Sequence, residues 1–458
     1  MAKIIIGEAV DSGAAATAEG RATGKKLQRK ARNLDGLARL IGRFIPPEIF
    51  SGPRERIYSP WVTFVAFLGQ VLTRESPCRG AVRRLQACCV AARQPVPDEN
   101  TSGYCQARAR LELAQVQEAH EHVVQWFEGQ GPAAGWLGRQ VRVLDGCGVS
   151  MPDTAQNRAR WPYAGGQKPG CGFPTAQLVG LFSLATGQLT RFAFADWKAH
   201  EIPLARQLVP WIEPKEIVLA DRGFCGWGFI ALLQRKNADV VLRLHQARRA
   251  QNGRVTWPKP QRSSDTWGKD LWTELPNELS LRVVTFQVAV KGFRTKTVTV
   301  VTTLLDEEKY PDEAIAELYR RRWAVELFFR QIKTTLGLDV LRCLSPELIE
   351  KEVWMQVIAY NVIRALMCEA AKVHRVEVDR LSFKGTVDTL RQWTPLLAPA
   401  LFVSRVARLE LLRIIAADLV PLRPDRSEPR VRKRRPKNYQ LLTKPRHEMV
   451  VSPSRNQK

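Results

Sequence analysis

The order of apolar segments between residues 139 and 244 constrains the fold of this chain most. Two stretches with helical character, at about 199–212 and at GWGFIALLQRKN (226–237), separate segments rich in β-branched and aromatic residues. Those segments are RQVRVLD (139–145), TAQLVGLFSLA (175–185), QLTRFAFA (188–195), EIVLAD (216–221) and DVVLRL (239–244). The order β-β-β-α-β-α-β predicts an α/β domain with a mixed sheet and helices packed on it.

The sequence pattern changes on each side of this domain. LWTELP, LSLRVVTFQVAV and TKTVTVVTTLL have the composition of strands and predict a β insertion. The predicted divisions are a flexible basic arm (1–35), a helical domain (36–130), the sheet domain (139–244 and 305–373), the β insertion (245–304), C-terminal helices (374–422) and a basic tail (423–458).

The helical domain from 36 to 130 is a candidate DNA-binding domain. Ser59-Pro60 and Thr101-Ser102 have the chemistry of helix starts, and arginines cluster in CRGAVRRL and QARARLELAQ. A DNA-reading helix would present such clusters, and so would an ordinary solvated helix face.

Charge favours a polyanionic partner. The chain has 458 residues, a formal net charge of +25 and a pI near 10.1. Nucleic acid is the first expectation, although a basic protein that gains only solubility from its charge would look alike. The start lacks the apolar region of a signal peptide, and WVTFVAFLGQVL (61–72) is too short to span a bilayer. We therefore expect a cytoplasmic, nucleoid-associated protein with no membrane contact.

One acidic residue stands among bases in YRRRWAVELFFRQIK (319–333). The segment 311–337 has the start and stop residues of a helix, with Pro at its beginning and Gly at its end. At about 100° per residue, four side chains fall within roughly 60° of one another. They are Tyr319, Arg322, Glu326 and Lys333, and Arg330 lies about 40° to one side of Glu326.

Three carboxylates are candidates for one site. Asp145 and Asp221 are predicted at strand ends, where they can meet at one edge of the sheet, and Glu326 lies on the later helix. Three acids together require a cation, and hard oxygen ligands select Mg²⁺ or Mn²⁺. Two such ions can promote an in-line displacement at phosphorus, while Arg322, Arg330 and Lys333 could hold a polyanionic backbone.

Each of these residues also has an ordinary explanation. Asp145 before Gly146 could be a turn residue, Asp221 could pair with Arg222, and Glu326 could pair with a basic neighbour on its own helix. The joint pattern favours the shared site, because strand order, both aspartates and the basic stripe suit the same chemistry.

The spacing Tyr319-x2-Arg322-x3-Glu326-x6-Lys333 resembles the Tyr-Arg-Glu-Lys signature of the insertion-sequence-four class of bacterial DDE transposases. DG at 145–146 and ADRGF at 220–224 resemble that family's two aspartate motifs, and the β insertion falls where the family has one. The family often has Ser or Thr after DG, whereas this chain has Cys147. The resemblance covers about 139–373.

The resemblance implies a ribonuclease-H-like core in which Asp145, Asp221 and Glu326 bind two Mg²⁺ or Mn²⁺ ions and carry catalysis. It further implies that Tyr319, Arg322 and Lys333 hold the terminal phosphates of the element. The implied activity is cleavage at the ends of an insertion sequence and joining of those ends to target DNA, by at least a homodimer. The family flips a base onto an insertion tryptophan, for which Trp257, Trp267 and Trp272 are equal candidates here.

Two other functions fit the same sequence. One is a catalytically inactive DNA-binding regulator derived from a transposase, against which the presence of all three acids argues. The other is a structure-selective nuclease built on the same core, which would cut DNA without preference for inverted-repeat ends.

Overall fold

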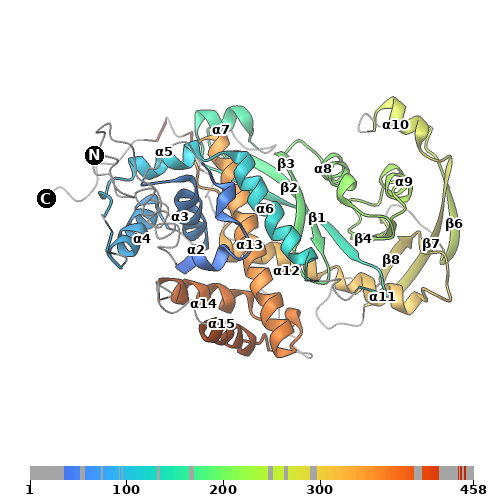
Figure 1. The fold of residues 1–458 in the computed structure, drawn as a ribbon. Coiled ribbons are helices and arrows are strands. Elements are labelled where there is room, and N and C mark those ends of the chain that lie inside the picture. Colours follow the sequence, from blue (N-terminus) through green and yellow to red (C-terminus); the bar gives the residue numbers. More distant parts are fainter. Residues whose placement is uncertain are drawn as a thin grey trace, which may run out of the picture. The chain divides into compact units, whose positions relative to one another are not determined.

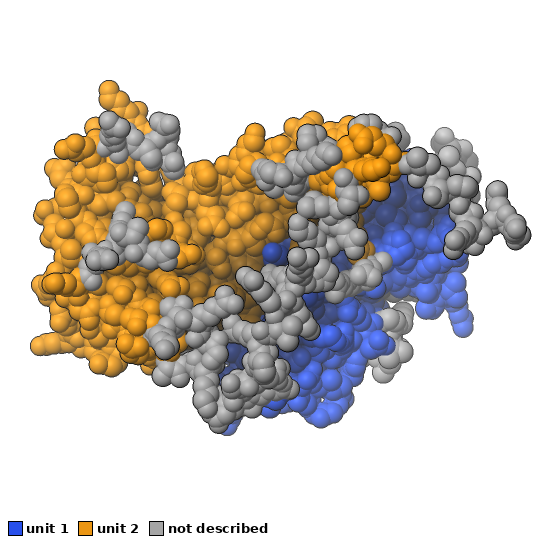
Figure 2. Space-filling view, turned by 180° about the vertical axis from the view of Figure 1, so that it is seen from behind, with its two compact units in different colours: residues 1–132, 330–338, 350–422 blue, residues 133–329, 339–349, 423–458 orange. Residues whose placement is uncertain are grey.

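The computed structural model describes the chain at 36–51, 57–73, 76–91, 93–94, 96–130, 135–163, 170–245, 251–261, 267–288, 297–396 and 405–421, and at residues 442, 444, 445, 448 and 449 (Figure 1). Two compact units divide it, as coloured in Figure 2. One consists of residues 1–132, 330–338 and 350–422, and the other of residues 133–329, 339–349 and 423–458.

The second unit contains one eight-stranded mixed sheet. Its strands are β1 (Val141–Ser150), β2 (Thr175–Ser183), β3 (Leu189–Asp196), β4 (Ile217–Ala220), β5 (Asp239–Arg243), β6 (Gly253–Pro258), β7 (Glu278–Gln287) and β8 (Thr297–Thr302). They are arranged in the order β3-β2-β1-β4-β5-β8-β7-β6. The first three pair antiparallel, β4 and β5 run parallel to β1, and the last three pair antiparallel. The predicted mixed α/β fold is confirmed.

Helices cover both faces of this sheet (Figure 1). On one face, α8 (Glu201–Leu208) and α9 (Trp227–Arg235) pack on the strands through an apolar cluster that includes Leu144, Ala220 and Ile230. On the other face, α11 (Asp312–Arg321) packs on β5 and β7, and Phe328 of α12 (Ala324–Arg330) contacts Phe182 of β2. Short helix α7 (Ala155–Arg160) follows β1, and a 3-10 turn (Val209–Trp211) follows α8.

The segment of the predicted β insertion contains strands β6, β7 and β8. They extend the main sheet, because β8 pairs antiparallel with β5. LWTELP, which the sequence assigns to a strand, is wrong as a strand prediction: most of it lies in helix α10 (Lys269–Glu274). Trp272 packs there against Trp227, and Leu271 packs on the apolar cluster, so burial on a helical surface overrides the β propensity of the segment.

The predicted continuous helix over 311–337 begins and ends as expected but is broken inside. After α11, the amides of Arg322 and Trp323 bond to carbonyls three residues back. A π-helical segment (Gln331–Leu336) then follows α12, and Gly337 ends it in the left-handed region at φ 99°. The guanidinium of Arg322 lies over the rings of Tyr319 and Trp323, at 5.6 and 6.0 Å from their centroids. This packing accompanies the tight turn, so the four-residue stripe of the sequence analysis does not hold as an α-helical face.

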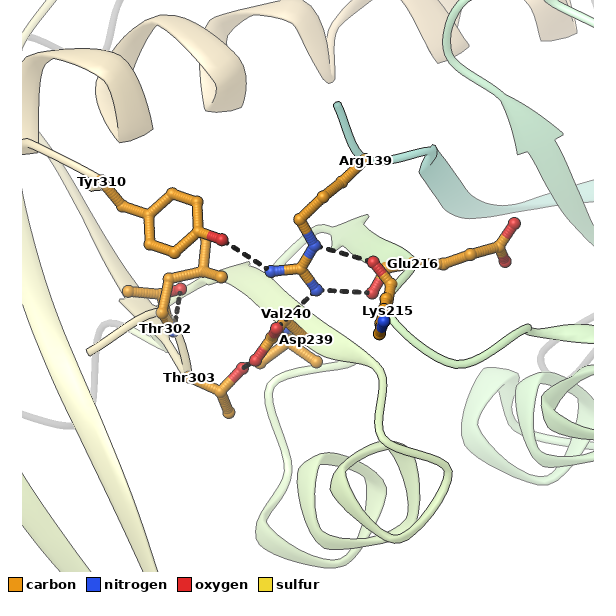
Figure 3. A network of polar contacts seen from close by, with 9 residues as sticks. Arg139, Lys215, Glu216, Asp239, Val240, Thr302, Thr303 and Tyr310 are labelled. Carbon is orange, nitrogen blue, oxygen red and sulfur yellow. Dashed lines mark hydrogen bonds and ion pairs between the residues drawn. The ribbon is translucent and has the colours of Figure 1, made fainter. Parts of the chain in front are cut away.

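A network of polar contacts joins the central strands β1, β4 and β5 at the ends opposite to the aspartates (Figure 3). Arg139 donates to the carbonyl of Lys215 at 2.7 Å, to Asp239 at 2.5 Å and to the hydroxyl of Tyr310 at 3.2 Å. Thr303 in turn donates to Asp239. This network fixes the beginnings of β1, β4 and β5 relative to one another.

The first unit is helical. Its helices are α2 (Gly36–Ile41), α3 (Pro60–Leu72), α4 (Cys78–Ala91), α5 (Ser102–Arg110), α6 (Leu113–Glu128), most of α13 (Pro346–His374), α14 (Phe383–Leu396) and α15 (Arg405–Ala417). Short 3-10 turns lie at Pro47–Ile49 and Val378–Arg380. Ser59 caps α3 by accepting from the amide of Val62 at 3.3 Å, as the sequence predicts, and α3 is largely buried.

Residues 350–373, which the sequence analysis groups with the sheet, pack with the N-terminal helices. Lys351 donates to the carbonyl of Ala109 at 2.7 Å, and Asn361 and His120 form a buried hydrogen bond at 3.3 Å. Within the described ranges, no helix is long and apolar enough to cross a membrane.

Candidate active site

Asp145 and Asp221 lie in the same register on two neighbouring strands. β1 pairs in parallel with β4 from Val141 opposite Ile217 to Val143 opposite Leu219, and each aspartate follows two residues later. The prediction that a strand ends at Asp145 is wrong, because β1 continues to Ser150 beside β2. The two aspartates still lie at one end of a strand pair, because β4 ends at Ala220. In the described part of the chain, β1 is next bridged on that side only at Ser150, which pairs with Val340.

Both aspartates point away from α8. Leu144 and Ala220 belong to the apolar cluster under α8 and α9, and side chains alternate between the faces of a strand. Asp145 and the position of Asp221 therefore fall on the opposite face, which α11 and α12 cover. Each carboxylate accepts a local amide: Gly146 donates to Asp145 at 2.9 Å, and Gly223 donates to Asp221 at 2.7 Å.

Asp145 lies in an electrostatically crowded place. Burial, and to a smaller extent the charges of Asp221 and Glu326, raise its pKa to about 6. The Gly146 amide and the Arg322 guanidinium act in the opposite direction. Asp221 and Glu326 therefore both lie within electrostatic reach of Asp145, although the three carboxylates come from segments more than 70 residues apart.

Glu326 reaches the site from the first turn of α12. Its side chain is 63% exposed, whereas that of Arg322 is 7% exposed, and Arg322 Nη2 lies 3.7 Å from Glu326 Oε1. Glu326 therefore does form the ion pair with Arg322 that its position four residues later allows. It does not exclude the shared site, because Arg322 acts electrostatically on Asp145 as well.

Tyr319 is fully buried. Its hydroxyl lies 3.4 Å from the carbonyl of Ala220, to which it donates, and Ala220 directly precedes Asp221. Burial raises the pKa of Tyr319 to about 12, against the lowering effect of Arg322 and Arg243. In this arrangement the side chain braces the end of β4.

Glu201, the first residue of α8, is a carboxylate that the sequence analysis does not single out. Gln177 donates to its Oε1 at 3.1 Å, and its Oε2 lies 3.3 Å from the place that a Cβ on Gly223 would occupy. Burial and then the charges of Asp221 and Asp145 raise the pKa of Glu201. No local motif marks this residue; its position at the start of the helix after the third strand is the only signal.

The donors suit a hard divalent cation in their chemistry. Asp145, Asp221 and Glu201 are half-buried carboxylates that make no ion pair with any residue in the described ranges. No group of three His, Cys, Asp or Glu side chains in those ranges is close enough to hold one ion. Mg²⁺ commonly takes only one or two carboxylates and keeps several waters, so pairs of these acids are sufficient.

The remaining residues predicted to contact DNA, Arg330 and Lys333, and the insertion tryptophans are not among the residues that contact the aspartates. Arg330 is exposed at the end of α12 and Lys333 is half-buried in the π-helical segment, and both belong to the helical unit. Among the insertion tryptophans, Trp267 is buried against Gly228, whereas Trp257 and Trp272 are only partly buried.

Comparison with known proteins shows the family of the chain. Residues 136–362, which contain Asp145, Asp221 and Glu326, match the family described as the transposase DDE domain. The chain belongs to this family of DDE transposases. Members of the family generally use divalent metal ions.

The relatives narrow the class to insertion-sequence transposases. The chain is 27% identical over 392 residues to the transposase InsG for insertion sequence element IS4 of Escherichia coli K12, which is 82% of this chain and 86% of that protein. It is 26% identical over 200 residues to a putative transposase for element IS4SA of Synechocystis, covering 43% of this chain and 54% of the relative. A piggyBac transposase synaptic complex with hairpin DNA gives 10% identity over 84% of each chain and a TM-score of 0.42, too low to define a common fold.

Proposed function

We propose that this protein binds the terminal inverted repeats of an insertion sequence, cleaves DNA at the element ends and joins those ends to target DNA. The observation that carries the proposal is the common register of Asp145 and Asp221 on adjacent parallel strands. The charge of Glu326, on α12, acts on the carboxylate of Asp145. The 27% identity to a full-length insertion-sequence transposase supports it.

The core is proposed to be ribonuclease-H-like. Three antiparallel strands followed by two parallel ones, in the order β3-β2-β1-β4-β5, support this assignment. Helices on both faces of these strands are consistent with it, and β6, β7 and β8 are then an addition to its edge.

Asp145, Asp221 and Glu326 are proposed to hold two Mg²⁺ ions, for which Mn²⁺ can substitute. Bound there, the ions would supply activation of the attacking water or hydroxyl and stabilisation of the leaving oxygen. The protein's own residues prepare this site: Gly146 and Gly223 orient the aspartates, and Arg322 offsets part of their charge.

Arg322, Arg330 and Lys333 are proposed to contact phosphates at the element ends, since cationic side chains bind phosphate oxygens strongly. The resemblance assigns Tyr319 to this group as well. Its complete burial and its contact with Ala220 support a bracing role for Tyr319 instead. A homodimer is the proposed active assembly, because two element ends must be joined to one target.

The test is cleavage of end-bearing DNA by purified protein in Mg²⁺, comparing wild type with Glu326→Gln and Asp221→Asn. Both variants should bind the DNA as wild type does and cleave at least 100-fold more slowly. Glu317→Gln is the matched control, because Glu317 is exposed on α11, and it should cleave normally. If wild type cleaves no faster than Glu326→Gln, the protein is not a cleaving enzyme.

Joining distinguishes the proposal from a nuclease. Wild type should transfer the cleaved ends to a supercoiled target and should prefer DNA that carries the inverted repeats. Cleavage of branched DNA with no end preference and no joining would support a structure-selective nuclease instead.

A further inference from the structure

Glu201 belongs to a group of acids whose charge is only partly offset, by Arg322 acting on Asp145. It lies half-buried beside Asp145 and Asp221, both of which act on it electrostatically. Within the described ranges, none of the three makes an ion pair. Like charges gathered in a partly buried place are unstable unless a cation joins them.

Two glycines make this approach possible. Glu201 comes from α8, on the face of the sheet opposite to the side chains of Asp145 and Asp221. A Cβ on Gly146 would overlap Glu201 Oε1, and a Cβ on Gly223 would come within 3.3 Å of Glu201 Oε2. Gly146 belongs to the first aspartate motif, DG, and Gly223 to the second, DRG. Because neither glycine has a side chain, both leave room for the carboxylate of Glu201.

The Glu201 carboxylate is held in place. Gln177 of β2 donates to Oε1 at 3.1 Å, which leaves Oε2 directed to Gly223, where Asp221 Oδ1 is 3.1 Å from the same Cβ position. A solvated surface glutamate at a helix start would need neither this hydrogen bond nor two missing side chains.

We propose that Glu201 is a fourth acidic ligand of the active site: it binds a divalent cation in a pair with Asp221, and Asp145 contributes to that ion through a bound water. The proposal rests on the proposed function, since it assumes that the aspartates hold the metal. It assigns Gly146, Gly223 and Gln177 a positioning role for Glu201.

The test measures Mn²⁺ binding to the full chain without DNA, by electron paramagnetic resonance titration at pH 8. Glu201→Gln should weaken binding of one Mn²⁺ by about 10- to 100-fold. Asp145→Asn should weaken it at least as much. Glu278→Gln, which alters an exposed residue of β7, should leave it unchanged. Wild-type affinity in Glu201→Gln with loss in Asp145→Asn overturns the role of Glu201 and leaves the proposed function standing. Wild-type affinity in both overturns the metal site itself.

Thermal unfolding separates a ligand from a structural residue. In EDTA, Glu201→Gln should melt no lower than wild type, because it removes a repelling charge and keeps the shape. With Mn²⁺ added, wild type should gain more in Tm than Glu201→Gln does. A lower Tm for Glu201→Gln in EDTA would assign the residue to the fold rather than to the metal.

Glycine substitutions test the spatial argument. Gly146→Ala should lower both Tm and Mn²⁺ affinity, since its Cβ displaces Glu201. In the Glu201→Ala background, Gly146→Ala should cost clearly less in Tm, because the overlapping carboxylate is gone. Equal losses in the two backgrounds would contradict the arrangement.

Discussion

Asp145 and Asp221 occupy equivalent positions on neighbouring parallel strands, at the point where β4 ends and β1 continues with β2. Both lie on one face of the sheet, and Glu326 and Arg322 act on Asp145 from the helices over that face. The pairing of these two strands brings together two carboxylates that are more than 70 residues apart in the sequence.

The pH dependence of metal-free stability should report Asp145. Folding raises its pKa from 3.8 to about 6, so the folded state binds more protons than the unfolded state between those values. The metal-free protein should lose stability as pH rises from about 4 to about 6, and the loss is complete above that range. Asp145→Asn should therefore melt higher than wild type at pH 8 in EDTA, and the difference should shrink toward pH 4. A constant difference would contradict the raised pKa.

Arg322 should matter more than its neighbour Arg321. Arg322 is buried over Tyr319 and offsets the charge of the acids, whereas Arg321 is exposed on the same turn. We expect Arg322→Gln to lower the free energy of unfolding by about 2 kcal/mol, and Arg321→Gln to change it by less than about 0.5 kcal/mol. Urea denaturation in EDTA measures both. Equal effects would show that Arg322 has no special place in the turn.

Arg139 should stabilise the sheet where the central strands β1, β4 and β5 begin. Its side chain is 15% exposed, and its guanidinium bonds to Asp239, Tyr310 and the carbonyl of Lys215. Arg139→Ala should cost about 2–4 kcal/mol of unfolding free energy, because it leaves a partly buried carboxylate without its partner. Arg254→Ala is the control: it removes a surface pair with Glu307 at 3.9 Å and should cost less than about 1 kcal/mol. A small loss for Arg139→Ala would mean that the network is not needed for the sheet.

Lys333 and Arg330 should contribute to DNA binding through phosphates. Each contact releases counterions, so Lys333→Ala or Arg330→Ala should weaken binding of end-bearing DNA and reduce the slope of log affinity against log salt by about 1. Lys384→Ala, which alters an exposed lysine paired with Asp388 on α14, should leave the slope as it is. Fluorescence anisotropy at several salt concentrations measures the slopes. An unchanged slope in Lys333→Ala would remove that residue from the phosphate contacts.

The sequence by itself determined the class of fold, and it predicted a site made of Asp145, Asp221 and Glu326. Short segments rich in β-branched and aromatic residues, separated by helical ones, predict the mixed sheet, since the two kinds of segment favour strands and helices respectively. The spacing from Tyr319 to Lys333 identified the family, which the match over residues 136–362 confirms. The predicted strand end at Asp145 was wrong, because local propensity does not include the partner strand β2, which extends β1 to Ser150. The predicted continuity of the helix at Arg322 was wrong as well, because propensity does not include the packing of the guanidinium on aromatic rings.

Only the tertiary structure decided how the acids meet and which others join them. The common register of Asp145 and Asp221 comes from the pairing of β1 with β4, which no local spacing encodes. Glu201 has no motif; its place beside the aspartates depends on α8 packing under the sheet and on the space left by Gly146 and Gly223. The burial of Tyr319 likewise depends on α11 lying on the sheet, where its hydroxyl reaches the residue before Asp221. Residue types fix what a side chain can bind, and long-range packing fixes which side chains share a site.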